Sequence, residues 1–567
     1  MRIFWLKITF FLFLVAIILR LFWWQVIKAD LLQSQAEKQH FEQTEVSPVR
    51  GNIIYSDGSI LASSNPSYLV YGLPKTIRIS ERWDLSDKLA KLIIKDDKGD
   101  KIAELAKDFL NKLSQNLYWV PLYKNVNNQT KKEIEELKLS GIGFEAGSIR
   151  FYPEGSSSAQ LLGFVGSDTG GKNVGYFGLE GFYEGELKGV EGSTKNEKDA
   201  LGLPILTGSF FQTRAKNGKD LNLYLDRSVQ FMVENALRKG VEKYGAKGAL
   251  AIVANPKDGG ILAMASFPNY DPLNFFDYPK EFYKNPAVAL TFEPGSTFKV
   301  LVMAAALNED FLKVDAICDI CDGPIQMGGF TIKTWNNKYF PNATMKDVIV
   351  HSDNTGMVFV GKKLGLDKLY AYLENFGFGR LTNIDLQDEA LSDLRSKEQW
   401  REIDLATVSF GQGIAVTPIQ MISAVASLAN GGKLMEPHVV KSIEDEEEIF
   451  EIKPRVVREV LKEGTAKIIT EMMVKAVSEG EAKWAKPKGF KIAGKTGTAQ
   501  IPISGHYDPE KTIASFVGFA PADDPKFVML VIYDQPTTSV YGSETAAPTF
   551  FEIAKELFTY YKIAPSE

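Results

Sequence analysis

An almost unbroken apolar run occupies residues 8–27, near the start of the chain. At ~1.5 Å of rise per residue, a helix over this run is about 30 Å long, which matches the hydrocarbon core of a bilayer. Arg20 interrupts the run, but its long side chain can reach the interface, where Trp23 and Trp24 are also favoured. The pattern predicts an uncleaved transmembrane anchor at 8–27, after a short, positively charged cytoplasmic tail at 1–7. A buried core helix is the alternative interpretation.

Residues 28–225 have a mixed pattern that is rich in turns. A polar helical pattern covers 28–46, and an alternating segment at 48–64 carries an Asp-Gly turn typical of a β-hairpin. Residues 84–144 are charged and helix-like with one strand-like patch, whereas 145–225 combines many glycines with short apolar runs. We expect a juxtamembrane stalk followed by a mixed, β-rich domain.

Longer elements begin at residue 226. Residues 226–244 show helical spacing with a polar face, and 249–266 predicts two strands around a turn. A helix-rich middle follows. Three further strands and a last helix are predicted at 489–500, 514–521, 526–536 and 547–562. Because strands occur at both ends of this region with helices between them, we expect one sheet built from distant segments, an α/β or α+β domain over 226–567.

The composition is that of a globular protein: of 567 residues, 45% are hydrophobic and 24% are charged. The net charge of −6 gives no reason to expect a nucleic-acid partner. The chain has four histidines, which weakens a Ser-His-Asp site or a histidine-rich metal site. Cys318 and Cys321 suit a redox pair or half a zinc site, but a local disulfide or two loop thiols is the favoured interpretation. We expect no metal and no cofactor.

Candidate chemistry begins with an S-x-x-K motif at Ser296 and Lys299, directly after Pro294-Gly295 and before a helix-forming segment. Ser296 is predicted at the helix N-terminus, where free N–H groups and the helix dipole favour developing negative charge. Residues three apart share a helix face, so we expect Lys299 beside the Ser296 hydroxyl. A desolvated lysine can lose its proton near neutral pH and activate a serine. The pair predicts a nucleophile and its base.

Ser352-Asp353-Asn354 is the second motif. A hydroxyl beside a lysine can relay a proton to a leaving amine, which is the role expected of Ser352. The carboxamide of Asn354 offers one donor and one acceptor to a substrate amide. A helix cap is the alternative interpretation of this tripeptide.

The third motif is Lys495-Thr496-Gly497-Thr498, in an apolar, strand-like context. Lys and Thr groups suit a substrate carboxylate, and a glycine without a Cβ lets a peptide approach the strand edge closely. An ordinary edge strand ending in a glycine turn is the alternative. The ordered set S-x-x-K, S-D-N and K-T-G is far more specific than each motif alone, because together they are the signature of β-lactamases and penicillin-binding proteins.

Residues 489–496 also match the phosphate-binding pattern G-x-x-x-x-G-K-T. That loop follows a strand and opens a helix, whereas here the variable positions are strand-like and the sequence after them is a poor helix former. Nucleotide binding is therefore not expected.

With these motifs, the chain resembles the class B penicillin-binding proteins, which are monofunctional peptidoglycan D,D-transpeptidases. The resemblance runs nearly end to end through RLFWWQV, PVRGNI, RFYP (150–153), GLEGFYEGEL, AMASFPNYDP and SFGQGIAVTPIQ. It implies a transpeptidase domain of the penicillin-binding/β-lactamase fold at 226–567, after a stalk and non-catalytic pedestal (dimerisation) domain at 28–225. The KTGTAQ, SFVGFAPADDPKF and YGSETAAPTFFEI segments look like the division-specific (FtsI-like) branch, with the elongation-type branch as the alternative.

The resemblance also implies a reaction. Ser296 attacks the penultimate D-Ala carbonyl of a stem peptide with Lys299 as base, and the N–H groups of Ser296 and Thr498 form the oxyanion hole. Ser352 relays the proton to the leaving D-Ala, and Asn354 holds the peptide amide. An acceptor amine resolves the acyl-enzyme into a cross-link, and β-lactams acylate the same serine. The terminal carboxylate is bound by Lys495, Thr496 and Thr498.

The resemblance further implies partners and a location. The expected partners are stem peptides, β-lactams, the membrane through one anchor, and a glycan polymerase of the FtsW/RodA kind with other divisome or elongation proteins. The expected location is the bacterial inner (cytoplasmic) membrane, with a periplasmic or extracytoplasmic catalytic domain. A D,D-carboxypeptidase or β-lactamase is one alternative, but no E-x-x-L-N follows Ser352 before Lys495. A β-lactam sensor or inactive divisome scaffold is another, although the short tail leaves little room for an output domain.

Overall fold

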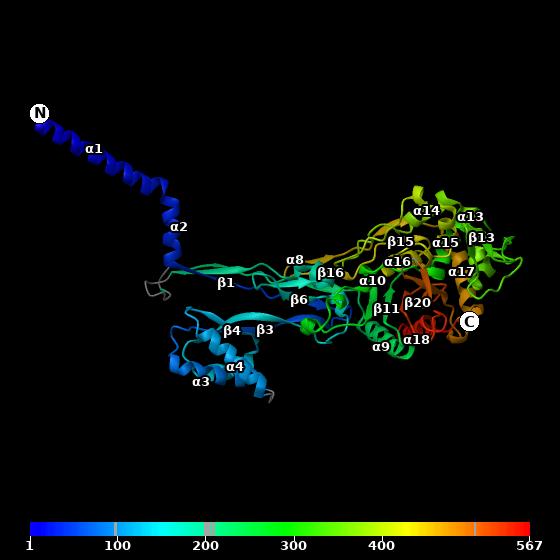
Figure 1. Cartoon of the computed structure of the whole chain (residues 1–567), viewed down its shortest axis with the longest axis horizontal. Coiled ribbons are helices and arrows are strands. Elements are labelled where there is room, and N and C mark those ends of the chain that lie inside the picture. Colours follow the sequence, from blue (N-terminus) through cyan, green and yellow to red (C-terminus); the bar gives the residue numbers. More distant parts are fainter. Residues whose placement is uncertain (96–98, 198–204, 206–209, 504–505, 567) are drawn as a thin grey trace. The chain divides into compact units, whose positions relative to one another are not determined.

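The computed structural model describes residues 1–95, 99–197, 205, 210–503 and 506–566. The chain forms two compact units, and Figure 1 shows the order of their elements. The first unit comprises 1–50, 67–147 and 188–218. The second unit comprises 51–66, 148–187 and 219–567. The second unit holds all three motifs and also takes in three segments that lie before residue 226, namely 51–66, 148–187 and 219–225.

The first unit begins with an apolar helix. α1 (Arg2–Phe22) continues through a π-helical turn at Trp23–Ile27. Within the described part of the chain this is the one helix long and apolar enough to cross a membrane, with 26 residues and none of its apolar window buried. The helix starts at Arg2, so most of the predicted tail is helical.

The predicted stalk is only partly helical. α2 (Ala29–His40) is followed by β1 (Phe41–Val46), which pairs antiparallel with β8 (Gly192–Glu197). β9 (Phe210–Thr213) pairs with the other side of β8. The segment FEQTEV contains Phe, Thr and Val, which favour a strand. The prediction of a helix over its whole length was therefore wrong at 41–46.

A small α/β core completes the first unit. Apolar side chains that include Leu89, Phe109 and Leu122 are buried between its helices and strands. β3 (Ile60–Gly72) and β5 (Ile142–Phe151) contribute residues to both units. The other elements of this core are α3 (Arg82–Ile93), α4 (Gly99–Leu113), β4 (Val120–Val126) and α5 (Asn128–Glu136).

The centre of the second unit is a five-stranded antiparallel sheet in the order β12-β11-β21-β20-β19. Its strands are β11 (Gly248–Ala254), β12 (Ile261–Phe267), β19 (Ala493–Ile503), β20 (His506–Ala520) and β21 (Phe527–Asp534). The strands come from both ends of the region, which confirms the predicted sheet of distant segments. β19, which carries the K-T-G motif, is an edge strand.

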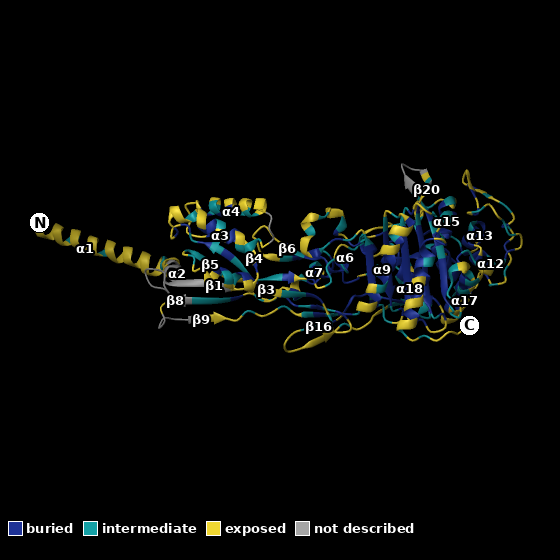
Figure 2. Cartoon of the chain, turned by 90° about the horizontal axis from the view of Figure 1, so that it is seen from below, coloured by how far each residue is buried: buried dark blue, intermediate teal, exposed yellow. Residues whose placement is uncertain are grey.

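Helices cover both faces of this sheet. Alternate residues of β11 face opposite cores, with Ala251 and Val253 in one and Leu250 and Ile252 in the other, as the two-residue period of a strand requires. α9 (Arg227–Tyr244) and α18 (Ala546–Tyr560) lie over the first face, and Figure 2 shows the buried strands behind them. The second face carries α11 (Lys299–Asn308), α13 (Asn354–Leu364), α16 (Pro418–Ala429) and α17 (Glu463–Glu479).

The segments from before residue 226 join this unit through a second sheet and the same core. The predicted hairpin at 48–64 is confirmed by β2 and the start of β3, with Gly58 at φ 85° in the turn. Such a φ favours glycine. Ile53, Leu61 and Leu179 are buried in the same core as α11. The strands of this sheet that lie wholly in the second unit are β2 (Ile53–Ile54), β10 (Asp220–Leu223), β16 (Val440–Glu444) and β17 (Ile449–Glu451).

Shorter elements fill the rest of the second unit. The helices are α6 (Ala159–Leu162), α7 (Gly178–Phe182), α8 (Glu184–Leu187), α10 (Pro286–Ala289), α12 (Met345–Val350), α14 (Leu366–Asn375) and α15 (Glu402–Ser409). The strands are β6 (Phe164–Ser167), β7 (Asn173–Tyr176), β13 (Ile325–Met327), β14 (Phe330–Ile332), β15 (Lys433–Met435) and β18 (Val456–Glu459).

The cysteine pair forms a disulfide between Cys318 and Cys321, one of the two arrangements favoured from the sequence. Both residues are buried in the main core, and the Cys318 N–H donates to the carbonyl of Ala343. Disulfide sulfurs are not thiolates, so in this state the pair is no metal ligand. Among the described residues, no cluster of three or more His, Cys, Asp or Glu side chains suits a metal ion.

Candidate active site

Ser296 lies on a 3₁₀ turn, η5 (Gly295–Phe298), that leads directly into α11. Helical hydrogen bonding of the α type therefore begins at Lys299, one turn later than the sequence predicted. The Gly295 N–H donates to the carbonyl of Gly411 at 2.9 Å. A Cβ on Gly411 would lie 2.1 Å from the Gly295 oxygen, so a side chain is excluded there. The backbone of the nucleophile turn is thus held by a second loop.

Lys299, the first residue of α11, is 0% exposed. Its Nζ donates to the Ser352 carbonyl at 2.6 Å and to Asn354 Oδ1 at 2.7 Å, and it lies 3.4 Å from Ser352 Oγ. Among the described residues, no hydrogen bond joins Lys299 Nζ to Ser296 Oγ. The ammonium is therefore engaged by the second motif in this state.

Ser352 stands between α12 and α13 with a φ of 55°, a left-handed conformation that is uncommon for serine. Residues held in this way cluster at functional sites. Its Oγ lies 2.9 Å from Lys495 Nζ as well as 3.4 Å from Lys299 Nζ. One buried hydroxyl therefore connects the two lysines of the first and third motifs.

The other two residues of the S-D-N motif have separate tasks. Asp353 caps α13, because its Oδ1 accepts from the N–H groups of Thr355 and Gly356. The helix-cap interpretation thus holds for the middle residue. Asn354 Oδ1 accepts from Lys299, and its Nδ2 donates to the Lys333 carbonyl at 2.9 Å. A carboxamide has two N–H groups and two lone pairs, so one donor and one acceptor remain for a substrate.

The third motif lies on the edge strand β19. Lys495 is 3% exposed, and its Nζ also contacts the carbonyl oxygen and Oγ1 of Thr496 at 3.2 and 3.3 Å. Thr498 Oγ1 accepts from the N–H of Gly542 at 3.1 Å. The strand thus presents its Lys and Thr groups beside the Ser352 hydroxyl.

Gly497 also has a packing role that the sequence did not predict. The sequence favoured close approach of a peptide to the strand edge. In the structure, a Cβ at this position would lie 2.4 Å from Ser515 Oγ and 2.8 Å from Thr297 Cγ2. The glycine therefore allows β19 to pack directly against the turn that carries Ser296.

Burial lowers the pKa of both lysines of the cluster. Burial, followed by repulsion from Lys495, holds the pKa of Lys299 well below its ordinary value, while Asp353 and Glu481 oppose this shift. Burial lowers the pKa of Lys495 to about 8, again against the charge of Glu481. Titratable groups whose pKa values are shifted by burial and by a specific charged neighbour are typical of functional sites.

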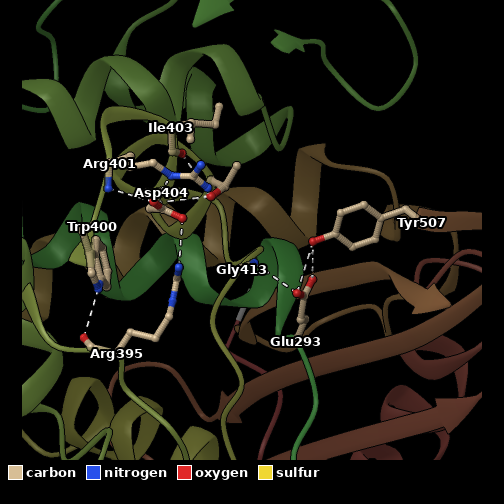
Figure 3. Close-up of polar contacts among 9 residues, drawn as sticks. Glu293, Arg395, Trp400, Arg401, Ile403, Asp404, Gly413 and Tyr507 are labelled. Atoms are coloured by element: carbon tan, nitrogen blue, oxygen red, sulfur yellow. Dashed lines mark hydrogen bonds and ion pairs between the residues drawn. The ribbon is translucent and has the colours of Figure 1, made fainter. Parts of the chain in front are cut away.

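Glu293, three residues before Ser296, connects the Ser296 turn to two distant segments. Its Oε1 accepts from the Gly413 N–H at 3.1 Å and from the Tyr507 hydroxyl at 3.2 Å, as Figure 3 shows. Burial raises the pKa of Glu293, which these hydrogen bonds oppose. The sequence motifs do not predict this contact.

The loop that holds Gly295 follows α15, and Asp404 fixes the start of that helix. Asp404 Oδ2 accepts from the Arg401 N–H at 2.8 Å, and its Oδ1 pairs with Arg395 Nη2 at 2.9 Å (Figure 3). The SFGQG segment was noted in the sequence as part of the resemblance, but the cap was not. The cap, α15 and the glycine loop form one support for the nucleophile turn.

Comparison with known proteins identifies the family of each domain. Residues 249–555 match the family described as the penicillin binding protein transpeptidase domain, and residues 45–223 match the penicillin-binding protein dimerisation domain. The chain is 34% identical to stage V sporulation protein D of Bacillus subtilis, over 96% of this chain and 83% of that protein. It is 29% identical to peptidoglycan D,D-transpeptidase FtsI of Escherichia coli, over 96% and 89% of the two chains.

The crystal structure of penicillin binding protein 2X from Streptococcus thermophilus has a TM-score of 0.76 and 25% sequence identity, and the match covers 92% of this chain and 80% of that one. The chain belongs to the penicillin-binding transpeptidases. A dimerisation domain followed by one transpeptidase domain makes it a class B penicillin-binding protein, a serine-type D,D-transpeptidase with relatives in the FtsI branch. The predicted family and fold class are confirmed.

Proposed function

We propose that this protein cross-links peptidoglycan stem peptides in septal wall synthesis, through an acyl-enzyme on Ser296. The observation that carries the proposal is the buried cluster in which Ser352 Oγ contacts both Lys299 Nζ and Lys495 Nζ. A serine on a neighbouring turn, a lysine with a lowered pKa and a hydroxyl relay are the groups that acyl transfer requires.

Acylation begins at the donor peptide. Ser296 Oγ forms a bond to the carbonyl carbon of the penultimate D-Ala, and its proton passes to neutral Lys299. The N–H groups of Ser296 and Thr498 hold the developing oxyanion. The bond from carbon to the terminal D-Ala nitrogen then breaks, and that nitrogen leaves with a proton delivered through Ser352.

Transfer reverses these steps with a different amine. The acceptor amine of a second stem peptide attacks the ester carbon, the bond to Ser296 Oγ breaks, and the proton of the amine returns to the serine. The product is an amide cross-link, and no water is consumed. A β-lactam enters the first step in the same way, but its leaving nitrogen stays attached to the acyl group.

Substrate binding uses the remaining polar groups. The free donor and acceptor of Asn354 hold the peptide amide. The terminal carboxylate of the donor meets the third motif, where Lys495 supplies charge and Thr496 and Thr498 supply hydroxyl groups.

The division role is supported by similarity to two relatives. FtsI and stage V sporulation protein D both match nearly the whole chain. Because the sporulation protein is 34% identical, a role in the wall of a developing spore is the second candidate. Deletion of the gene distinguishes the two, since filamentation of growing cells supports the septal role and a defect confined to sporulation supports the second.

We further propose the domain division and location expected from the sequence. Residues 8–27 cross the bacterial inner (cytoplasmic) membrane once after the tail at 1–7, 28–225 form the stalk and pedestal, and 226–567 form an extracytoplasmic transpeptidase domain. A membrane glycan polymerase of the FtsW/RodA kind and divisome proteins are the proposed partners. Protease treatment of spheroplasts tests the orientation, because the transpeptidase domain must be cleaved without lysis.

Labelling with a fluorescent penicillin tests the nucleophile. Wild type must become labelled, whereas Ser296→Ala must lose the label by a factor of ~10⁴ or more, with an unchanged melting temperature. Ser478→Ala is the matched control, because this serine hydroxyl donates within its own helix to Val474 at 2.9 Å. An unlabelled wild-type protein contradicts the proposal.

Product analysis distinguishes transfer from hydrolysis. Incubation of the protein with polymerised, uncross-linked glycan must yield dimeric stem peptides together with one free D-Ala per cross-link. Release of D-Ala without dimers would identify a D,D-carboxypeptidase instead.

A further inference from the structure

Glu481 belongs to no motif, yet the fold brings its backbone to the active site. α17 ends at Glu479, and Gly480 caps it. A Cβ on Gly480 would lie 3.1 Å from the carbonyl oxygen of Val350, two residues before Ser352. The close approach of these backbones brings Gly480, the residue before Glu481, to the end of α12, which leads into the S-D-N turn. α17 also packs against α11 and β19, the elements that carry the two lysines.

The carboxylate of Glu481 is unusual in its surroundings. Its Oε1 is buried, and it has no hydrogen-bond partner among the described residues. An unpaired buried carboxylate oxygen is costly, and such groups in native proteins require an explanation. Burial lowers the pKa of Lys299 and of Lys495, and the charge of Glu481 opposes that shift at both. Asp353, the other carboxylate near the cluster, acts in this way on Lys299.

We propose that Glu481 is a positioning residue for the transpeptidase reaction, whose carboxylate offsets the positive charge of the two buried lysines, Lys299 and Lys495. The inference rests on the proposed roles of Ser296 and these lysines. Glu481 touches neither the substrate nor the scissile bond in this scheme. Its effect is electrostatic, through the groups that move the proton.

Other charged groups surround this part of the molecule. Lys346 and Asp347 on α12 act on Glu479, and Asp347 also interacts with His351. These groups remain in every variant below, so a difference between variants reports the charge of Glu481. The charged and titratable groups on elements packed around the end of α17 are Lys299, Lys346, Asp347, His351, Asp353, Lys483 and Lys495.

Removing the negative charge has a defined sign. Without Glu481 both lysines hold their protons less tightly. Lys299 must be neutral to accept the serine proton, so the acidic limb of the pH–rate profile moves to lower pH. Lys495 must be charged, so the basic limb moves to lower pH as well. The bell-shaped profile therefore moves as a whole, which a purely structural lesion does not cause.

The test compares Glu481→Gln with wild type in the rate of acylation by a fluorescent penicillin over a range of pH. Both limbs must move to lower pH, and the rate about one pH unit above the wild-type optimum must fall roughly three- to tenfold. Glu481→Asp, which keeps the charge, must restore the profile. Glu479→Gln is the matched control, because Glu479 is exposed and pairs with Lys475 on its own helix.

Two results would overturn the inference. A Glu481→Gln profile with unmoved limbs, at full or reduced height, removes the electrostatic role. Slower hydrolysis of the penicilloyl-enzyme with unmoved limbs would assign Glu481 to water activation instead.

Failure of the proposed function is distinguishable from both, because wild type itself would then carry no label on Ser296. If Glu481→Gln folds poorly, the limbs of Glu481→Asp decide, since a shift there contradicts a role of the charge alone.

Discussion

The second unit buries positive charge in two regions, and the two regions treat it differently. At the first, Arg150 Nε donates to Glu180 Oε1 at 2.6 Å, and both side chains are almost completely buried. Arg150 Nη1 also donates to the carbonyl of Gly51 at 2.7 Å and contacts Ser64 Oγ at 3.2 Å. The guanidinium thus has a direct counter-charge and neutral acceptors besides.

At the second region, Lys299 and Lys495 are buried as deeply, but their hydrogen bonds go to neutral oxygens. These acceptors belong to Ser352, Asn354 and Thr496. The carboxylates of the region act at a distance and keep one oxygen each without a partner among the described residues: Asp353 Oδ2 and Glu481 Oε1.

The difference separates a structural charge from a reactive one. A buried cation in direct contact with a carboxylate keeps its charge, because losing it would leave the carboxylate alone. A buried cation held by neutral oxygens is under-compensated, so its proton is labile. Perturbed groups of this kind cluster at functional sites. The comparison predicts that substitutions in the first region change stability and substitutions in the second change activity.

In the second region, the substitution Lys299→Met has the largest expected effect. The acylation rate with a fluorescent penicillin falls by roughly 10³- to 10⁴-fold, because the serine loses its base. The free energy of unfolding changes by less than about 2 kcal/mol, since the lost hydrogen bonds are offset by removal of a buried charge. Lys362→Met, at an exposed lysine of α13, is the control and leaves both quantities unchanged. Near-normal labelling of Lys299→Met would rule out this lysine as the base.

In the first region, the substitution Glu180→Leu removes the ion pair with Arg150. It leaves Arg150 buried without its counter-charge, so the free energy of unfolding in urea falls by about 3–5 kcal/mol. The acylation rate of the folded protein stays within about twofold of wild type, because the pair contacts no reacting group. The double variant Arg150→Met/Glu180→Leu recovers most of the loss. If single and double variants are equally unstable, packing and not the ion pair holds this region.

Sequence periodicity predicts the main helices and strands of the second unit. It does not predict the side-chain contacts that distinguish the two regions. The strands of the central sheet alternate strongly between apolar and polar or between two buried faces. The helices at 226–244 and 547–562 show a strong helical period. Both kinds of element can therefore be predicted from the sequence. Arg150 and Glu180 both lie in segments quoted for the family resemblance. Nothing in their spacing pairs them, because the pairing is set by tertiary packing.

The candidate site divides in the same way. The ordered motifs predicted Ser296, Lys299, Ser352 and Lys495, and the structure joins the last three by hydrogen bonds. Glu481 could not be predicted, since it stands in no motif and reaches the site only because α17 ends against α12. The packing of Gly497 on β19 against the turn that carries Ser296 could not be predicted either, because it depends on the fold. The chemistry of the motifs can therefore be predicted from the sequence. The charged groups around the motifs can be identified only once the fold is known.

The pH dependence of Lys495 tests the comparison further, because activity and the free energy of unfolding must change with pH in opposite directions. Burial lowers the pKa of Lys495 from 10.5 to about 8. Above this pH the acylation rate falls about tenfold per unit as the ammonium is lost. Between pH values of about 8 and 10.5 the unfolded chain holds one more proton on this lysine than the folded protein does. The free energy of unfolding therefore rises with pH, by about 1.4 kcal/mol per unit from this group. Urea denaturation of wild type and Lys495→Met over this range isolates the contribution, and a wild type that loses activity and stability together would trace the loss to unfolding and not to Lys495.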